Sequence, residues 1–263
     1  MLKRTLLASL LATTGIVLAS GAGAQTLAAL TGDNTIVIVD AAAKSAGKSW
    51  QVSGISGRVQ GIDVRPADGM LYGVIDDGSI VTIDTATGKA TVKAKLESTL
   101  PSRVTATVDF NPVADRLRLI GSDGTNLRVN VDDGKVIRDG NLAFAGSDSM
   151  KEMKPNVVAG AYTNSVKGAK ETALFDVDAS GTLVKQAPPN DGILNTIGKL
   201  GVPQKMVAFD ILSDGAGANT AWMIAGETLY TVDLASGAAT AQGKISGLPG
   251  QVRDMAILPA KPM

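Results

Sequence analysis

Four aspartates of this chain lie in similar short contexts, each between apolar residues, and carboxylates placed in this way can carry out chemistry. The contexts are GIDVRP, TVDFNP, VAFDIL and VRDMAIL, and the aspartates are Asp63, Asp109, Asp210 and Asp254. If they converge, their oxygens can hold Ca²⁺ or Mg²⁺, and the cation can polarise a substrate while an Asp acts as the base. They are therefore the first candidate site, either as a cation site or as a structural ring of carboxylates.

Four converging carboxylates need compensation, because burying an unpaired charge costs several kcal/mol. Three kinds of partner are available: a bound cation, backbone amides of neighbouring units, or arginines such as Arg65, Arg103 and Arg253. Because the aspartates recur along the chain as an architectural element does, we expect amide and arginine partners. A Ca²⁺ or Mg²⁺ ion is the alternative.

Arginines alternate along the stretch VDFNPVADRLRLIGSDGTNLRVN at 108–130, at positions 116, 118 and 128. Such arginines either pair with carboxylates between packed elements, which is the more common arrangement, or bind an anion at an open surface. Arg116 and Arg118 are two residues apart and share one strand face. If the ligand is an anion, we select Arg116 as the candidate residue that binds it.

Two turn-like motifs have functional alternatives. PPNDGILN at 188–195 has polar residues typical of a binding loop, but Pro-Pro-Asn-Asp-Gly is also a strong chain-reversal signal. Its candidate ligand-binding residues are Asn190, Asp191 and Asn195.

DVDASG at 176–181 begins like a calcium loop, but Ala187 stands where the closing Glu belongs. Because DTATG, NVDDG and DLASG recur elsewhere, we interpret DVDASG as a turn.

The chain contains neither His nor Cys. This excludes zinc and copper sites built on these residues, haem on a His ligand, and Ser-His or Cys-His nucleophiles. The aromatic residues are only two Trp, three Tyr and four Phe, so stacking platforms for carbohydrate or single-stranded nucleic acid are disfavoured. We therefore expect no haem, zinc or copper as a cofactor, and Ca²⁺ or Mg²⁺ is the one cofactor type left open. An enzyme is the less favoured class.

Internal repetition predicts the fold. The segment 61–96 reads as four β-strands joined by short turns, and similar units follow it along the chain. Comparable positions in the first strands are Ile62, Val108, Val158, Val207 and Val252, with spacings of 46, 50, 49 and 45 residues. These spacings are typical of four-stranded propeller blades. We predict an all-β, five-bladed β-propeller of antiparallel blades, and a β-sandwich or solenoid is less favoured.

The two ends of the chain complement each other in this prediction. VRDMAILP at 252–259 supplies one first strand, whereas residues 26–55 supply three strands without a first. Pairing the C-terminal strand with the N-terminal blade closes the ring and removes exposed sheet edges. In this arrangement the four aspartates lie on innermost strands, around the central channel, and VVAGAYT at 157–163 is the one first strand without an Asp.

The first residues indicate export. MLKRTLLASLLATTGIVLASGAGAQ has a basic start, a short apolar run and a small-residue cleavage site, which predicts a signal peptide at 1–24 and a single domain at 25–263. Without Lys3 and Arg4 the chain has 23 basic and 25 acidic residues. This balance favours neither nucleic acid nor a polybasic membrane contact. We expect a periplasmic or secreted monomer with no transmembrane segment after signal removal.

Three motifs resemble the bacterial DUF4394 family: the stretch at 108–130, PNVVAGAYTNS at 155–165, and PPNDGILNTIGKLGV at 188–202. The resemblance covers residues 27–258 and implies an exported, propeller-related protein without an established function. By elimination we expect a binding or interaction module for an unknown small molecule or envelope protein. The alternatives are a cation-dependent hydrolase or lyase and, third, a structural envelope protein.

Overall fold

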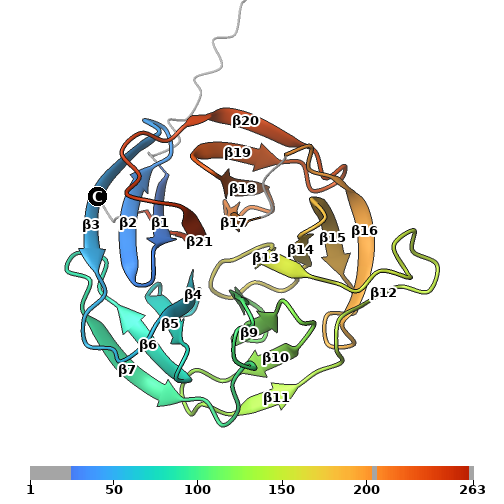
Figure 1. The fold of residues 1–263 in the computed structure, drawn as a ribbon, viewed down its shortest axis with the longest axis horizontal. Helices are drawn as coiled ribbons and strands as arrows, with labels where there is room; N and C mark the ends of the chain where they lie inside the picture. Colours follow the sequence, from blue (N-terminus) through green and yellow to red (C-terminus); the bar gives the residue numbers. More distant parts are fainter. Residues whose placement is uncertain (1–24, 203–205, 261–263) are drawn as a thin grey trace, which may run out of the picture.

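A computed structural model describes residues 25–202 and 206–260, so the predicted signal peptide at 1–24 lies outside the described residues. Five sheets surround a central axis and form a five-bladed β-propeller (Figure 1). Blade 1 is β21-β1-β2-β3, blade 2 is β4 to β7, blade 3 is β8 to β11, blade 4 is β13 to β16, and blade 5 is β17 to β20. The predicted fold class is therefore confirmed.

The blades share one order of strands from the axis outward. The inner strands are β21 (Val252–Ile257), β4 (Val59–Val64), β8 (Ala106–Asn111), β13 (Val157–Tyr162) and β17 (Val207–Ser213). The second strands are β1 (Thr26–Thr31), β5 (Leu71–Ile75), β9 (Arg116–Gly121), β14 (Leu174–Asp178) and β18 (Asn219–Ala225). The third strands are β2 (Thr35–Asp40), β6 (Ser79–Ile83), β10 (Asn126–Val129), β15 (Thr182–Gln186) and β19 (Thr228–Val232). The outer strands are β3 (Ser45–Gln51), β7 (Ala90–Lys95), β11 (Val136–Arg138), β16 (Ile193–Lys199) and β20 (Ala239–Lys244).

Burial decreases from the axis to the rim. The second strand β5 is buried along its whole length, whereas the outer strands β7 and β20 are mostly exposed. Apolar side chains of adjacent blades pack face to face; for example, Leu30 and Ile36 of blade 1 share a cluster with Ile62 and Ile75 of blade 2. The core thus consists of apolar layers between adjacent blades, and every blade packs against both of its neighbours.

The ring closes as predicted. The C-terminal strand β21 pairs antiparallel with β1, with Leu27 opposite Ile257 and Leu30 opposite Asp254. Blade 1 is therefore built from both ends of the chain, and its inner strand comes last in the sequence.

The recurring turns are built by side-chain caps, as expected. Asp84 accepts hydrogen bonds from the backbone N–H groups of Ala86 and Thr87, and Asp233 caps its turn in the same way. In DVDASG, Asp178 accepts from the N–H of Ser180, which confirms the turn interpretation of that motif.

The outer strand of blade 3 is interrupted. Within the sequence KVIRDGNLAF at 135–144, β11 ends at Arg138. The following strand, β12 (Ala143–Phe144), instead pairs parallel with β16 of blade 4. The break occurs at Asp139, whose buried carboxylate turns inward to bind Arg118 and Arg128. The strand β12 thereby links blades 3 and 4 at the outer edge of the propeller.

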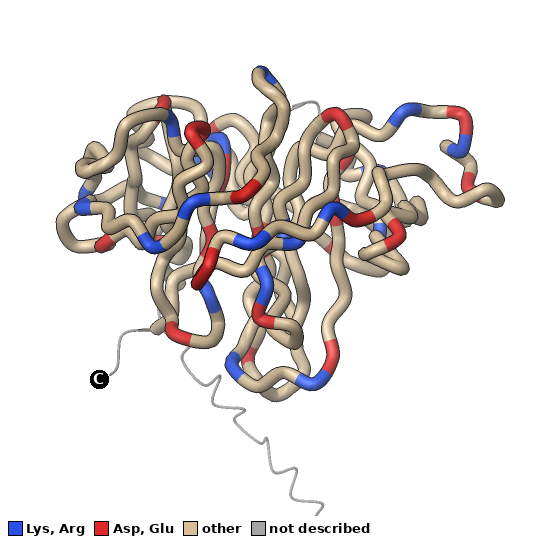
Figure 2. Tube along the Cα trace, turned by 90° about the horizontal axis from the view of Figure 1, so that it is seen from below, with Lys and Arg blue, Asp and Glu red and all other residues tan. Residues whose placement is uncertain are grey.

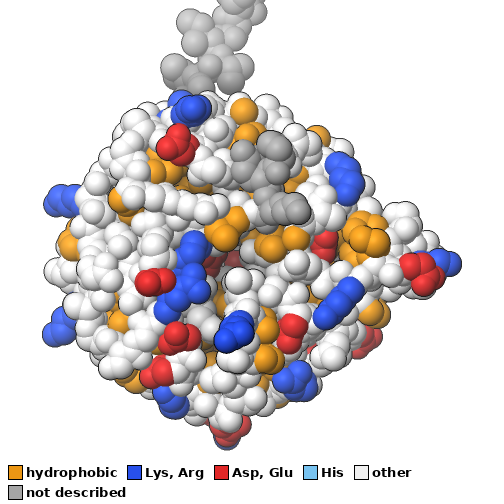
Figure 3. All heavy atoms as spheres, viewed as in Figure 1, with side chains coloured by type: hydrophobic (Ala, Val, Ile, Leu, Met, Phe, Trp, Pro, Cys, Tyr) orange, Lys and Arg blue, Asp and Glu red, His pale blue; other side chains and the backbone are white. Residues whose placement is uncertain are grey.

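The surface carries both signs of charge. Acidic and basic residues are interspersed along the loops and strands (Figure 2). The face turned to the viewer in Figure 1 has a small central hollow with basic side chains beside it (Figure 3). Within residues 25–202 and 206–260, no helix has the length and apolar character needed to cross a membrane.

Candidate functional site

The four recurring aspartates link the inner strands to one another. Each carboxylate accepts a hydrogen bond from a backbone N–H of the next blade's inner strand. The pairs are Asp254 with Ile62 (2.8 Å), Asp63 with Phe110 (2.6 Å), Asp109 with Tyr162 (2.9 Å) and Asp210 with Ile257 (2.6 Å). The aspartates therefore act as braces in one direction around the ring. The step from blade 4 to blade 5 has no such brace, because β13 carries no Asp.

Local bonds fix these carboxylates further. Asp63, Asp210 and Asp254 each accept a second bond from the N–H of the residue that follows them. All four ring side chains are buried. Gly61 leaves room for the carboxylate of Asp254, since a β-carbon there would lie 2.9 Å from its Oδ2. The predicted amide partners are therefore confirmed.

The predicted arginine partners are wrong. Arg65 donates to Asp115 and Asp132 of blade 3 instead, and Arg253 donates to backbone carbonyl groups, including that of Val59. Arg103 is exposed. Long side chains near the ends of the inner strands find partners in the loops, where charged groups remain closer to water.

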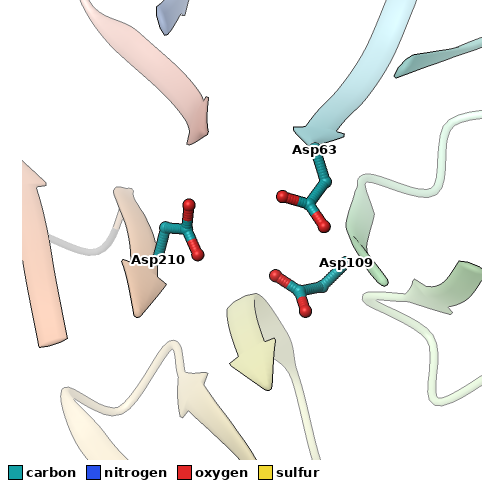
Figure 4. Close-up of side chains that lie close together, drawn as sticks. All are labelled: Asp63, Asp109 and Asp210. Carbon is teal, nitrogen blue, oxygen red and sulfur yellow. The ribbon is translucent and has the colours of Figure 1, made fainter. Parts of the chain in front are cut away.

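Three ring carboxylates converge closely. One oxygen from each of Asp63, Asp109 and Asp210 lies within 4.8 Å of the other two, and Figure 4 shows the three side chains turned toward a common space. We call these residues the axial triad. Two unit charges at this separation repel by about 3.5 kcal/mol at an effective dielectric constant of about 20. The triad therefore cannot remain fully ionised without a counter-charge.

Burial and mutual repulsion change the acidity of the ring. Burial, followed by the charge of Asp210, raises the pKa of Asp63 well above its ordinary value. Burial, followed by the charge of Asp63, does the same to the pKa of Asp109. Burial raises the pKa of Asp210 to about 6 and that of Asp254 to about 8. The ring carboxyl groups therefore keep their protons to a higher pH than an exposed Asp does.

A cavity opens onto the triad where the inner strands end. It has a volume of about 370 Å³, and Asp63 and Asp210 line it together with residues at the ends of β4, β17 and β21. Ser165 and Lys167, from the loop between β13 and β14, and Ser213 of blade 5 also contribute. We call this space the mouth cavity. It brings two of the predicted ring residues into contact with a ligand-sized space.

A second polar cluster lies between blades 3 and 4, with Arg118 at its centre. The guanidinium of Arg118 is 2% exposed and donates to Asn126, Asp139, Tyr162 and Asn190. Arg128 binds the same Asp139 carboxylate through two bonds. The three motifs that carry the family resemblance meet here, since each of them supplies a member of this cluster.

The other candidates selected from sequence have local contacts. Arg116 donates to the carbonyl groups of Ala114 and Asp115, in the loop before its own strand. Asn195 donates to the carbonyl groups of Lys185 and Ala187. Asp191 is exposed. The structure joins only Asn190 of this group to a buried network, and it places none of them in the mouth cavity.

Asp176 was considered in the sequence only as the first residue of the motif DVDASG, and not as a buried carboxylate. This side chain is fully buried on β14, opposite Gly160, and it occupies space that a β-carbon at position 160 would need. Burial raises its pKa to about 8, although the nearby charge of Arg118 opposes the shift. The available signal was an Asp between Phe175 and Val177 in an apolar strand, the same pattern that revealed the ring.

Replacing Arg118 by Met is expected to lower the free energy of unfolding by about 3–5 kcal/mol, because it leaves the buried Asp139 without one of its two arginines and leaves three further acceptors unpaired. Arg116→Met is the matched control, two residues away on the same strand face. Its loss should cost about 1 kcal/mol or less, since its bonds lie in a loop. Equal losses in urea unfolding would contradict this ranking of the two arginines.

The protein is a β-propeller of five four-stranded blades, and aspartate carboxylates link its inner strands. The mouth cavity at the axis is its candidate ligand site. The chain belongs to the family described as Domain of unknown function (DUF4394), which matches residues 35–256. No curated protein matches it. The resemblance inferred from the three motifs is thus confirmed.

Two solved structures illustrate what this chain is similar to. A protein of unknown function from Bacteroides thetaiotaomicron VPI-5482 is similar with a TM-score of 0.53 and 16% identity, over 89% of this chain and 64% of that chain. This chain therefore spans less than two thirds of that relative. A protein of unknown function from Bacteroides caccae is similar with a TM-score of 0.43 and 14% identity, over 86% and 75% of the two chains. At 16% identity, the likeness to the Bacteroides thetaiotaomicron protein concerns the fold alone.

Proposed function

We propose that this protein is a binding module that holds a small polar ligand in the mouth cavity. The observation that carries the proposal is a space of about 370 Å³ with two buried carboxylates, Asp63 and Asp210, in its lining. Ligand sites are typically concave, of this size, and provided with a few convergent polar groups on a rigid scaffold. The aspartate braces make the base of the cavity rigid.

The lining indicates the chemistry of the ligand. Carboxylates line the cavity at the axis, whereas Ser165, Lys167 and Ser213 come from loops around it. Lys167 is exposed and carries the opposite charge. A ligand with a positive or hydrogen-donating group toward the axis and an acceptor group toward Lys167 matches both ends. Zwitterionic molecules have this distribution of charge.

A wider cleft adjoins the mouth cavity over blade 2. It has a volume of about 820 Å³ and shares Gln25, Gly69 and Leu258 with the mouth cavity. Threonines and one lysine line its outer part: Thr82, Thr85, Lys89 and Thr91. A ligand longer than the mouth cavity therefore has a polar surface along which to extend.

A defined panel of compounds tests the proposal by thermal shift: a zwitterionic amino acid, a polyamine and a neutral disaccharide. We expect the amino acid or the polyamine to raise the melting temperature of the wild type and the disaccharide to have no effect. Ser213→Trp fills the cavity and should abolish the shift. Thr240→Trp, on the exposed outer strand β20, is the matched control and should keep it. A shift that survives in Ser213→Trp excludes the mouth cavity as the site.

We infer that the protein acts after export, in the periplasm or outside the cell, where the binding of small solutes is a common task of exported modules. This inference rests on the signal-peptide pattern of residues 1–24. The intact mass of the exported protein is expected to correspond to a chain that starts at Gln25. A mature chain that still carries Lys3 and Arg4 would contradict the assignment of compartment.

A further inference from the structure

We propose that the axial triad, Asp63, Asp109 and Asp210, binds a single Ca²⁺ ion at the inner end of the mouth cavity. The inference deepens the proposed function and rests on it, since the ion would form the inner end of the same site. Three ionised carboxylates and one Ca²⁺ together carry a net charge of −1, so this end of the cavity still attracts a positive group of the ligand. The three carboxylates come from blades 2, 3 and 5, and one oxygen of each lies within 4.8 Å of the others (Figure 4). Backbone N–H groups already hold each of them in place.

Hydrogen bonding at Asp109 is incomplete. Its Oδ1 accepts from Tyr162, but no donor among the described residues reaches its Oδ2, although the residue is only 4% exposed. Asp63 and Asp210, by contrast, have a backbone partner for both oxygens. Buried carboxylate oxygens are normally satisfied. The free oxygen therefore points to a positively charged partner in the space that the triad shares.

The interface between blades 3 and 4 also contains buried side-chain oxygens that have no hydrogen-bond partner among the described residues. Thr107, two residues before Asp109 and on the same face of β8, has an unpartnered hydroxyl oxygen. Asp176, fully buried in blade 4, has two unpartnered carboxylate oxygens and points toward Gly160. Gly160 lies two residues before Tyr162, the amide partner of Asp109. These unsatisfied side chains belong to the interface between blades 3 and 4, and the cation site does not depend on them.

The donor set selects the type of ion. The triad offers only carboxylate oxygens, and the chain has no His or Cys that would favour zinc or copper. Ca²⁺ accepts irregular arrangements of six to eight oxygens, whereas Mg²⁺ requires a near-ideal octahedron and gives up its water reluctantly. Three carboxylates in unequal, amide-constrained positions fit Ca²⁺ better. The mouth cavity supplies an entry path and space for water ligands.

Calorimetric titration of the chelator-treated mature protein with CaCl₂ tests the proposal. We expect one Ca²⁺ per chain and a loss of affinity of at least about tenfold in Asp109→Asn, since one of three charged ligands is removed. Asp254→Asn is the matched control, because Asp254 is also buried and amide-bonded but lies outside the triad. It should lose much less affinity than Asp109→Asn does.

Two results would overturn the cation site: a wild type that binds no Ca²⁺, and an Asp109→Asn variant that binds it as tightly as the wild type does. If Asp109→Asn fails to fold, as judged by circular dichroism, Asp210→Asn takes its place, with the same expected loss. Failure of the cation site leaves the proposed function open to its own test. A ligand-induced rise in melting temperature that Ser213→Trp abolishes would still support the proposed function, even if no Ca²⁺ were bound.

Discussion

Deletion of residues 252–263 is expected to abolish the cooperative unfolding transition of the whole protein rather than to loosen one end. The deleted segment contains β21, the inner strand of blade 1, so β1 would be left with an unpaired edge. The deletion also removes the Asp254 carboxylate that holds Ile62 and the amide that holds Asp210. Two interblade apolar clusters lose members at the same time. Because each blade packs on two neighbours, an open ring is destabilised throughout.

Calorimetry and circular dichroism of the purified proteins check this expectation. The control is a protein shortened by residues 261–263 only, which retains β21 and should melt close to the wild type. A protein without residues 252–263 that still melted in one sharp transition near the wild-type temperature would contradict closure through β21.

Raising the pH from about 4 to about 8 is expected to destabilise the chelator-treated protein. In the unfolded chain an Asp titrates near 3.8, whereas the pKa in the folded protein is about 8 for Asp176 and Asp254 and about 6 for Asp210. Between these values the folded protein binds more protons than the unfolded chain, so the free energy of unfolding falls as the pH rises. The stabilisation is complete below about pH 4 and is lost as the pH passes the folded-state values.

Asp176→Asn isolates one contribution to this slope. Each such group changes the free energy of unfolding by about 1.4 kcal/mol per pH unit in its window, so the variant should show a slope that is shallower by about this amount. Combining it with Asp254→Asn should remove a second increment. The measurement is urea unfolding at a series of pH values with chelator present. Curves that run parallel in wild type and variant would show that Asp176 is not a buried, proton-binding group.

Much of the architecture follows from the repeat. The spacing of the first strands predicted five blades, and the unmatched strands at the two termini predicted the closure between β21 and β1. The recurrence of Asp63, Asp109, Asp210 and Asp254 predicted inner positions and amide partners for the same reason. A residue that recurs at the same position of successive repeats has the same structural role in each of them, and such a role can be recognised in the sequence.

Contacts that depend on depth and on loops could not be predicted in this way. Arg116 and Arg118 lie on the same strand face, but only Arg118 lies deep enough to reach blade 4. Arg65 bonds to carboxylates in loops of the next blade, at positions that no local pattern reveals. The fourth strand of blade 3 ends at Arg138, just before Asp139, whose buried carboxylate pairs with Arg118.

The mouth cavity was also beyond sequence reasoning. Its lining comes from segments near both ends of the chain and from blades 2, 4 and 5, and these segments meet only after the ring has closed. Asp63 and Asp210 were selected as ring members, but their access to a ligand-sized space follows from the lengths and paths of several loops. Short contexts in a sequence do not determine such a convergence.

Native mass spectrometry combined with elemental analysis, on protein isolated from the cell envelope of the organism that makes it, tests most directly whether the mouth cavity is a binding site. We predict a mature chain that carries a bound small molecule, and a metal signal of one calcium per chain. The bound molecule should be absent from Ser213→Trp and present in Thr240→Trp prepared in the same way. A wild type that has the bare mass of its chain, indistinguishable in its bound content from Ser213→Trp, would contradict the proposal that this propeller is a ligand-binding module.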